Sequence, residues 1–233
     1  MRYGEQPPVQ VDLDVSMACP SSCGFCFSAG YRAARTSGRL MATDLIKSLL
    51  QAWAAAGVRL IRFDGGGDPL SHPDLPALIE HCDALGLRTA VLTAGDLLAP
   101  RQFAAFIRAR TYMRISLNAA TDATRAALHG TSPARHGVRR ILDTVAQLDA
   151  QRRAVFGDEA GTLMPLGATS MIHPGNATSR LGPGSRHAPP SGPRWRDGTP
   201  AAHFHAERRH AADRGEPQPV QPVPGRRVRV PIR

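Results

Sequence analysis

Three cysteines near the start of the chain could bind a metal. Cys19, Cys23 and Cys26 have the spacing Cys-x3-Cys-x2-Cys within one short loop. Thiolates are soft ligands, typical of zinc, copper(I) and iron–sulfur centres. A cubane of four irons and four sulfides has four corners, so three cysteines leave one iron open to a small molecule. An open coordination position is the mark of a catalytic rather than a structural metal site.

These cysteines could instead form disulfides or bind zinc. A disulfide scaffold fits poorly, because the whole chain has only four cysteines and its start does not have the pattern of a secretory signal. A closed zinc site needs four ligands, and no second Cys-x2-Cys or well-spaced His pair follows nearby. A zinc- or nucleic-acid-binding module that uses this loop and the basic end of the chain remains an alternative.

The segment before the cysteine loop has the pattern of a strand. Apolar and polar residues alternate from Val9 to Val15, and the loop begins where this pattern stops. In parallel α/β barrels the loops after the strands carry the active site. The position of the loop therefore fits a site for chemistry.

The same order of strand and helix continues along the chain. We predict further strands over residues 58–63, 88–93, 113–117 and 166–172, and helices over 43–57, 75–85, 97–109 and 135–155. Crossovers of this length give parallel strands. The fourth cysteine, Cys82, lies inside the second of these helices, and we expect it to be a small buried side chain rather than a ligand.

Two more loops at strand ends have residues suited to binding. The second strand runs into Asp64-Gly65-Gly66-Gly67-Asp68-Pro69. Consecutive glycines allow positive φ and a close approach of the backbone to a ligand, at an entropic cost that a plain turn seldom needs. The fourth strand ends in Ser116-Leu117-Asn118-Ala119, whose polar side chains would lie at the same end of the sheet.

With these three loops the chain resembles the radical S-adenosylmethionine (radical SAM) superfamily. The resemblance lies in the cysteine spacing, in Phe25 before the third cysteine, and in two motifs. Gly66-Gly67-Asp68-Pro69 is similar to the family's Gly-Gly-Glu-Pro-like motif, with Asp68 in place of Glu. Ser116-Leu117-Asn118-Ala119 is similar to Ser-Leu-Asp-Ala, with Asn118 in place of Asp. The likeness covers roughly residues 9–176 and is specific for cofactor chemistry rather than for a substrate.

The resemblance implies a role for each of these residues. Cys19, Cys23 and Cys26 would hold a [4Fe-4S] cluster, whose open iron binds the amino and carboxylate groups of S-adenosylmethionine. Residues near that cofactor would be Phe25, on its adenine side, with Gly65, Gly66, Gly67, Asp68, Ser116, Asn118 and Asn176. Asn176 is included because His173-Pro174-Gly175-Asn176 is similar to a Pro-x-Asn turn of the family. Arg125 and His129, in a helix-and-Gly segment also similar to the family, are expected to be structural.

The implied function is reductive cleavage of S-adenosylmethionine to a 5'-deoxyadenosyl radical. The substrate would be a peptide or a small molecule, and the electron would come from a donor such as flavodoxin or ferredoxin. A truncated, inactive iron–sulfur-binding remnant is the alternative, because the barrel pattern stops after Asn176.

The end of the chain differs from the rest in charge and composition. The formal net charge is +10, but residues 175–233 hold eleven arginines against four acidic residues, so the excess charge lies mostly at the end. Such a distribution, without interleaved aromatics on an ordered element, does not favour a nucleic-acid surface. Residues 177–233 also contain ten prolines and no apolar periodicity, which predicts disorder. This tail is either a native basic extension or the product of a frame shift.

We therefore predict three segments and one fold. Residues 1–8 are a disordered lead-in, residues 9–176 an incomplete (β/α) TIM-like barrel of about five parallel strands, and residues 177–233 a disordered tail. No apolar run is long enough to span a bilayer, and the cysteine content suits a reducing compartment, so we expect a cytoplasmic location.

Overall fold

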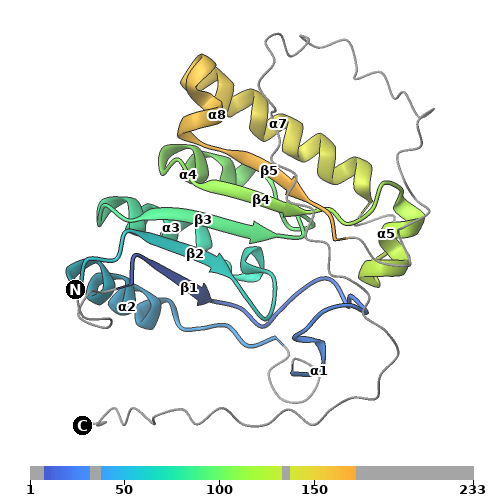
Figure 1. Cartoon of the computed structure of the whole chain (residues 1–233), viewed down its shortest axis with the longest axis horizontal. Helices are drawn as coiled ribbons and strands as arrows, with labels where there is room; N and C mark the ends of the chain where they lie inside the picture. Colours follow the sequence, from blue (N-terminus) through green and yellow to red (C-terminus); the bar gives the residue numbers. More distant parts are fainter. Residues whose placement is uncertain (1–7, 32–37, 133–136, 172–233) are drawn as a thin grey trace, which may run out of the picture.

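The computed structural model describes residues 8–31, 38–132 and 137–171, which form an α/β fold around one parallel sheet. Most of the predicted lead-in, the predicted tail and Asn176 lie outside these residues. The strands are β1 (Gln10–Asp14), β2 (Leu60–Asp64), β3 (Arg88–Thr93), β4 (Tyr112–Ser116) and β5 (Leu166–Thr169). They lie side by side in sequence order, all parallel, and their arrowheads point the same way in Figure 1. The predicted partial barrel of five parallel strands is confirmed.

Helices cover one face of this sheet. They are α2 (Thr43–Ala55), α3 (Leu75–Ala84), α4 (Phe103–Arg108) and α7 (Val138–Phe156). The short α1 (Ala29–Tyr31) and α5 (Asp122–His129) lie instead beyond the arrowheads, at the carboxyl ends of the strands (Figure 1). No helix among the described residues is long and apolar enough to cross a membrane.

The core lies between the sheet and the helices. Leu13, Phe63, Val91 and Met113 are neighbours across four strands, and all four are buried. Each such side chain contributes roughly 1.5–3 kcal/mol when it leaves water. Cys82 belongs to the same core and is fully buried, as expected from its place on a helix.

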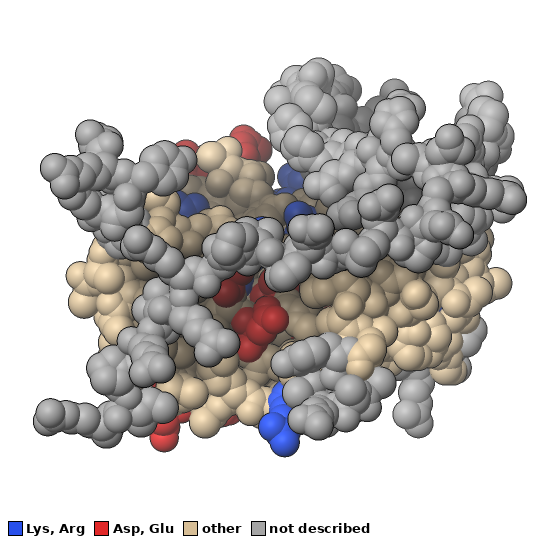
Figure 2. Space-filling view, turned by 60° about the horizontal axis from the view of Figure 1, so that its bottom comes forward, with Lys and Arg blue, Asp and Glu red and all other residues tan. Residues whose placement is uncertain are grey.

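The other face of the sheet is polar. Side chains alternate along a strand, so Asp12 and Arg62, which are register partners, both point away from the helices. Arg62 forms ion pairs with Asp12 and, at 3.7 Å, with Asp64. Figure 2, turned so that the β1 side of Figure 1 comes forward, shows acidic side chains grouped near the centre of the view. The carboxylates of this face thus lie on its β1 and β2 side.

Some predicted boundaries were wrong. The helix predicted over 97–109 begins only with the 3-10 turn η3 (Pro100–Gln102), which continues into α4. Pro100 has a fixed φ and no N–H, which suits a first helical position, and Ala99 before it is extended. The segment after α7, for which no helix was predicted, forms η4 (Gly157–Glu159) and α8 (Ala160–Leu163). Both are too short to show an apolar period.

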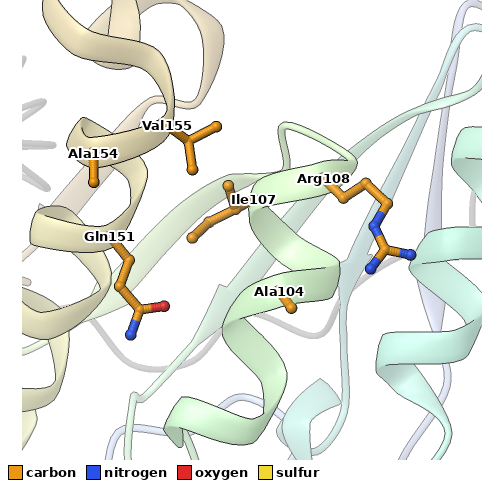
Figure 3. Close-up of a pocket in the computed structure, with 6 residues that line it drawn as sticks. All are labelled: Ala104, Ile107, Arg108, Gln151, Ala154 and Val155. Carbon is orange, nitrogen blue, oxygen red and sulfur yellow. The ribbon is translucent and has the colours of Figure 1, made fainter.

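A groove of about 540 Å³ lies between α4 and α7 in the outer helical layer. It is lined by Ala104, Ile107, Arg108, Gln151, Ala154 and Val155 (Figure 3). Its α4 residues immediately precede β4, so the groove is at the amino ends of the strands. The predicted site residues lie at the opposite edge.

Candidate active site

The loop that carries the three cysteines rests on the end of helix α5. The backbone N–H of Ser22 donates to the carbonyl of His129 at 2.8 Å, and that of Gly24 to the carbonyl of Leu128 at 3.4 Å. These carbonyls belong to the last turn of a helix, where no intrahelical donor remains for them. The loop thus provides donors for two carbonyls at the end of α5, and α5 fixes the loop at the carboxyl edge of the sheet.

The loop itself is tightly turned. Cys26 N–H donates to the carbonyl of Cys23 at 3.1 Å, and Ala29 N–H to the carbonyl of Cys26 at 3.2 Å. Cys19, Cys23 and Cys26 are all half-buried. The three predicted ligands therefore come from one local segment and remain partly accessible.

The glycine loop after β2 packs directly against the segment before the cysteines. A Cβ on Gly67 would lie 2.3 Å from the carbonyl oxygen of Ala18, and one on Gly66 would lie 2.5 Å from Sδ of Met17. Gly65 has φ +132°, and its Cβ would lie 2.4 Å from Oδ1 of Asp14. The backbone N–H groups of Gly67 and Asp68 donate at 2.9 Å to the carbonyls of Ser16 and Ala18. Gly67 is thus needed for close packing against the backbone of residues 16–18, and Gly65 for its positive φ, and the sequence did not predict this packing.

Ser28 joins these two loops through its side chain. Its hydroxyl donates to the carbonyl of Gly66 at 2.7 Å and lies 3.1 Å from Sγ of Cys26. Ser28 is itself buried. The third cysteine is therefore held against the glycine loop.

Asp68 is turned into the protein. Its carboxylate accepts hydrogen bonds at 2.8–2.9 Å from the hydroxyl of Thr93 and from the N–H groups of Leu70 and Ala94, and the residue is 3% exposed. Burial raises the pKa of Asp68, while these hydrogen bonds act in the opposite direction. The side chain fastens the end of β2 to the end of β3, and its effect on a cofactor would pass through the adjacent glycines.

Asn118 and Ser116 lie at the end of β4, as predicted. Ser116 is half-buried and is the register partner of Thr169 on β5. Asn118 has φ +54°, a left-handed conformation that Asn tolerates better than most residues. Its Oδ1 accepts from the backbone N–H of Met171 at 2.9 Å, and its Nδ2 lies 3.5 Å from Nε2 of His129.

His129 contacts a predicted ligand directly, which the sequence did not indicate. Its Nδ1 lies 3.4 Å from Sγ of Cys23, and the Phe25 ring packs edge-on against it, with centroids 5.6 Å apart. Burial, with the nearby Arg125 guanidinium, lowers the pKa of His129 to about 4. A Cys–His contact between residues 106 positions apart has no local sequence signal.

A buried ion pair supports this arrangement. Arg125 on α5 and Asp96, just after β3, are 2.9 Å apart, and the Ser21 hydroxyl donates to Asp96 at 3.2 Å. Arg125 also donates to the carbonyls of Leu117 and Ala94. The expectation that Arg125 is structural agrees with these contacts, whereas Asp96 and Ser21 were not identified from sequence.

The donor set of the cysteine loop fits an iron–sulfur cluster. Within residues 8–31, 38–132 and 137–171, no three His, Cys, Asp or Glu side chains converge closely enough to hold one metal ion. A zinc ion requires its ligands around one point, whereas each cysteine of a cubane binds a different iron. Three thiols on one loop, beside glycines without side chains, match the donor set of such a cluster.

Comparison with known proteins identifies the family. A family model for the Radical SAM superfamily matches residues 13–151, more than half of the chain. The chain belongs to this superfamily. The radical SAM prediction is confirmed, and with it the cofactors characteristic of the superfamily, a [4Fe-4S] cluster and S-adenosylmethionine.

Curated relatives of this radical SAM chain include two peptide cyclases. PqqA peptide cyclase from Xanthomonas euvesicatoria pv. vesicatoria (strain 85-10) is 38% identical over 89 residues, 38% of this chain and 23% of that protein. PqqA peptide cyclase from Bradyrhizobium diazoefficiens is 35% identical over 91 residues, 39% of this chain and 23% of that protein. The matched segment thus spans less than a quarter of these relatives.

Solved structures share the fold. Streptococcus suis SuiB bound to the precursor peptide SuiA has a TM-score of 0.53 at 20% identity, over 72% of this radical SAM chain and 34% of SuiB. Native anSMEcpe with bound AdoMet and a peptide has a TM-score of 0.53 at 14% identity, over 74% of this chain and 45% of that one.

Proposed function

We propose that this chain is the cofactor-binding part of a radical SAM enzyme that modifies a peptide, with Cys19, Cys23 and Cys26 as cluster ligands. The observation that carries the proposal is the joining of three loops at one sheet edge. Ser28 and the Gly67 N–H connect the cysteine segment to the glycine loop, and His129 connects Cys23 to Asn118.

The other site residues would bind S-adenosylmethionine or hold the loops that bind it. Gly65, Gly66, Gly67, Ser116 and Asn118 would bind S-adenosylmethionine, with Phe25 near the adenine, and Asn176 stays a prediction outside the described residues. Asp68 would hold the glycine loop in place. When bound and reduced, the cluster would supply the electron that cleaves S-adenosylmethionine to a 5'-deoxyadenosyl radical. A donor such as flavodoxin or ferredoxin, in the reducing cytoplasm, would suit this chemistry.

The open face of the sheet supports a peptide substrate. Arg114 on β4 is two residues beyond Tyr112, on the same face as Arg62, and its Nε is buried without a hydrogen-bond partner among the described residues. The residue as a whole is half-buried, and its guanidinium can donate to a carboxylate. The names of a relative, a peptide cyclase, and of a protein solved with a precursor peptide agree with a peptide substrate.

A pair of probe peptides tests the role of Arg114. We expect a fluorescently labelled peptide with a central Glu to bind the full chain more tightly than its Gln counterpart. Arg114→Met should remove that preference, at a cost of about 1.5–3 kcal/mol for a charged hydrogen bond. Arg88→Met, at the exposed start of β3, is the control and should keep the preference. Equal binding of both peptides to the unmodified chain would contradict this part of the proposal.

The activity itself is tested under anaerobic conditions. After reconstitution with iron and sulfide, the full chain should produce 5'-deoxyadenosine from S-adenosylmethionine when dithionite is added. A complete cluster without that product would instead support an iron–sulfur-binding remnant. Bound zinc without a cluster would support the zinc-module alternative.

A further inference from the structure

His129 connects a proposed cluster ligand to the end of strand β4. Its Nδ1 faces Sγ of Cys23 at 3.4 Å, and its Nε2 faces Nδ2 of Asn118 at 3.5 Å. The side chains of His129 and Asn118 are buried, with only 1% and 6% of each residue exposed. In such a place each polar atom needs a partner of the right kind, so the direction of each hydrogen bond can be worked out.

The direction of the hydrogen bonds of Asn118 and His129 follows from one backbone N–H group. The N–H of Met171 can only donate, and it lies 2.9 Å from Oδ1 of Asn118. The other amide atom of Asn118 is therefore the nitrogen, which also can only donate. Nε2 of His129 must then accept, so the single proton of the neutral ring is on Nδ1. That proton points at Sγ of Cys23.

The ring is also fixed in position. The carbonyl of His129 accepts from the N–H of Ser22, within the cysteine loop, and the Phe25 ring packs edge-on against the imidazole. Gly130 follows directly with φ +59° and ends α5. Backbone and ring are therefore both held in one orientation.

We propose that Met171, Asn118 and His129 form a hydrogen-bond relay whose N–H at Nδ1 donates to the Cys23 thiolate and raises the reduction potential of the cluster. This inference rests on Cys23 being a cluster ligand. Reduction adds negative charge to the cluster and its sulfurs, so a hydrogen bond donated to a ligand sulfur stabilises the reduced form. His129 and Asn118 are positioning residues here, because they act through Cys23.

The identity of residue 118 matters for this relay. An Asp, which the family motif has at this position, only accepts hydrogen bonds and would draw the ring proton to Nε2. Nδ1 would then present a lone pair to the thiolate. Asn118 and His129 are therefore a matched pair in this chain.

A redox titration followed by electron paramagnetic resonance tests the relay. The full chain is reconstituted with iron and sulfide, and His129→Phe is compared with the unmodified protein. At the midpoint potential of the unmodified protein, we expect His129→Phe to lower the ratio of reduced to oxidised cluster about tenfold, or about 59 mV for one electron. His129→Gln, which keeps an N–H donor, should restore most of the potential.

His81→Phe on α3 is the matched control and should leave the midpoint unchanged. An unchanged midpoint in His129→Phe, with full iron content, would overturn the relay. A loss of potential equally large in His81→Phe would overturn it as well.

A spectroscopic measurement covers the case in which His129→Phe binds no iron. With 15N-labelled histidine, the reduced cluster of the unmodified chain should show a 15N hyperfine coupling through the hydrogen bond, retained in His81→Phe and absent in His129→Gln. A cluster without this coupling would overturn the relay while leaving the proposed function intact. Failure of the unmodified chain to bind any cluster would instead overturn the proposed function, and the relay with it.

Discussion

Arg125 and Asp96 form an ion pair at 2.9 Å in which both side chains are completely buried. The pair joins α5 to the loop after β3, and through Ser21 it also reaches the cysteine loop. Arg125 further donates to two strand-end carbonyls. The pair therefore holds together α5 and the loop after β3, which both contact the cysteine loop.

Removal of one partner from this pair should be costly. We expect Arg125→Met to lower the free energy of unfolding by about 3–5 kcal/mol, because Asp96 is left as a buried charge. The control is Arg108→Met, which breaks the exposed 3.1 Å pair with Glu80 and should cost about 0–1 kcal/mol. Urea unfolding of the full chain without iron measures both values. Equal costs would show that the buried pair does not support the fold.

Gly130 should be essential for the position of the cysteine loop. It has φ +59°, and a Cβ there would lie 2.3 Å from Oγ of Ser22 and 3.0 Å from its carbonyl oxygen. We expect Gly130→Ala to cost about 1–3 kcal/mol and to reduce the iron bound after reconstitution. Gly161→Ala is the matched control, because its Cβ would meet no atom within 4 Å. Full iron binding by Gly130→Ala would show that the loop does not need this contact.

Cys82 should differ from the other three cysteines in its reactivity. Burial raises the pKa of its thiol to about 12, so almost none is thiolate near neutral pH. In the iron-free chain we expect iodoacetamide to modify the three loop cysteines first and Cys82 only after unfolding, as counted by mass spectrometry. Raising the pH toward 12 should increase the thiolate fraction. Equal modification rates for all four in the native chain would contradict the buried position.

We expect substitution of Asp68 to affect the free energy of unfolding directly and cofactor binding only indirectly. Asp68→Asn replaces one of two accepting oxygens by a donor that faces the N–H of Leu70 or Ala94, so we expect a loss of about 1–3 kcal/mol. Asp68→Glu restores the residue of the family motif but adds a methylene at a buried position, with a similar cost. Urea unfolding measures both. Stability unchanged by Asp68→Asn, with weakened S-adenosylmethionine binding, would point to direct contact with the cofactor instead.

The sequence predicts the sheet better than it predicts the site. The strand over 88–93 matches β3 at both ends, because a buried apolar run lies between a turn that ends at Gly86 and a bend at Gly95. The loops after β1, β2 and β4 were also located correctly, whereas β5 ends at Thr169, before the predicted end at residue 172. Periodicity and turn residues are local properties, and these elements depend mostly on them.

The supporting contacts depend instead on tertiary structure. Cys23 and His129, or Ser21 and Asp96, meet only because the parallel sheet brings its carboxyl ends together. The glycine loop was predicted from its conformational freedom, but its packing against Met17 and Ala18 needs the three-dimensional register of β1 and β2. Such contacts leave no pattern in a single sequence.

Whether this site holds both cofactors is tested most directly by the iron content and by the electron paramagnetic resonance of the reduced cluster, measured with and without S-adenosylmethionine. We predict about four irons per chain, a spectrum that changes when S-adenosylmethionine is added, and loss of iron in Cys23→Ala but not in Cys82→Ala. A cluster whose spectrum does not change when S-adenosylmethionine is added would contradict cofactor binding at this site. Full iron binding by Cys23→Ala would contradict the assignment of Cys23 as a cluster ligand.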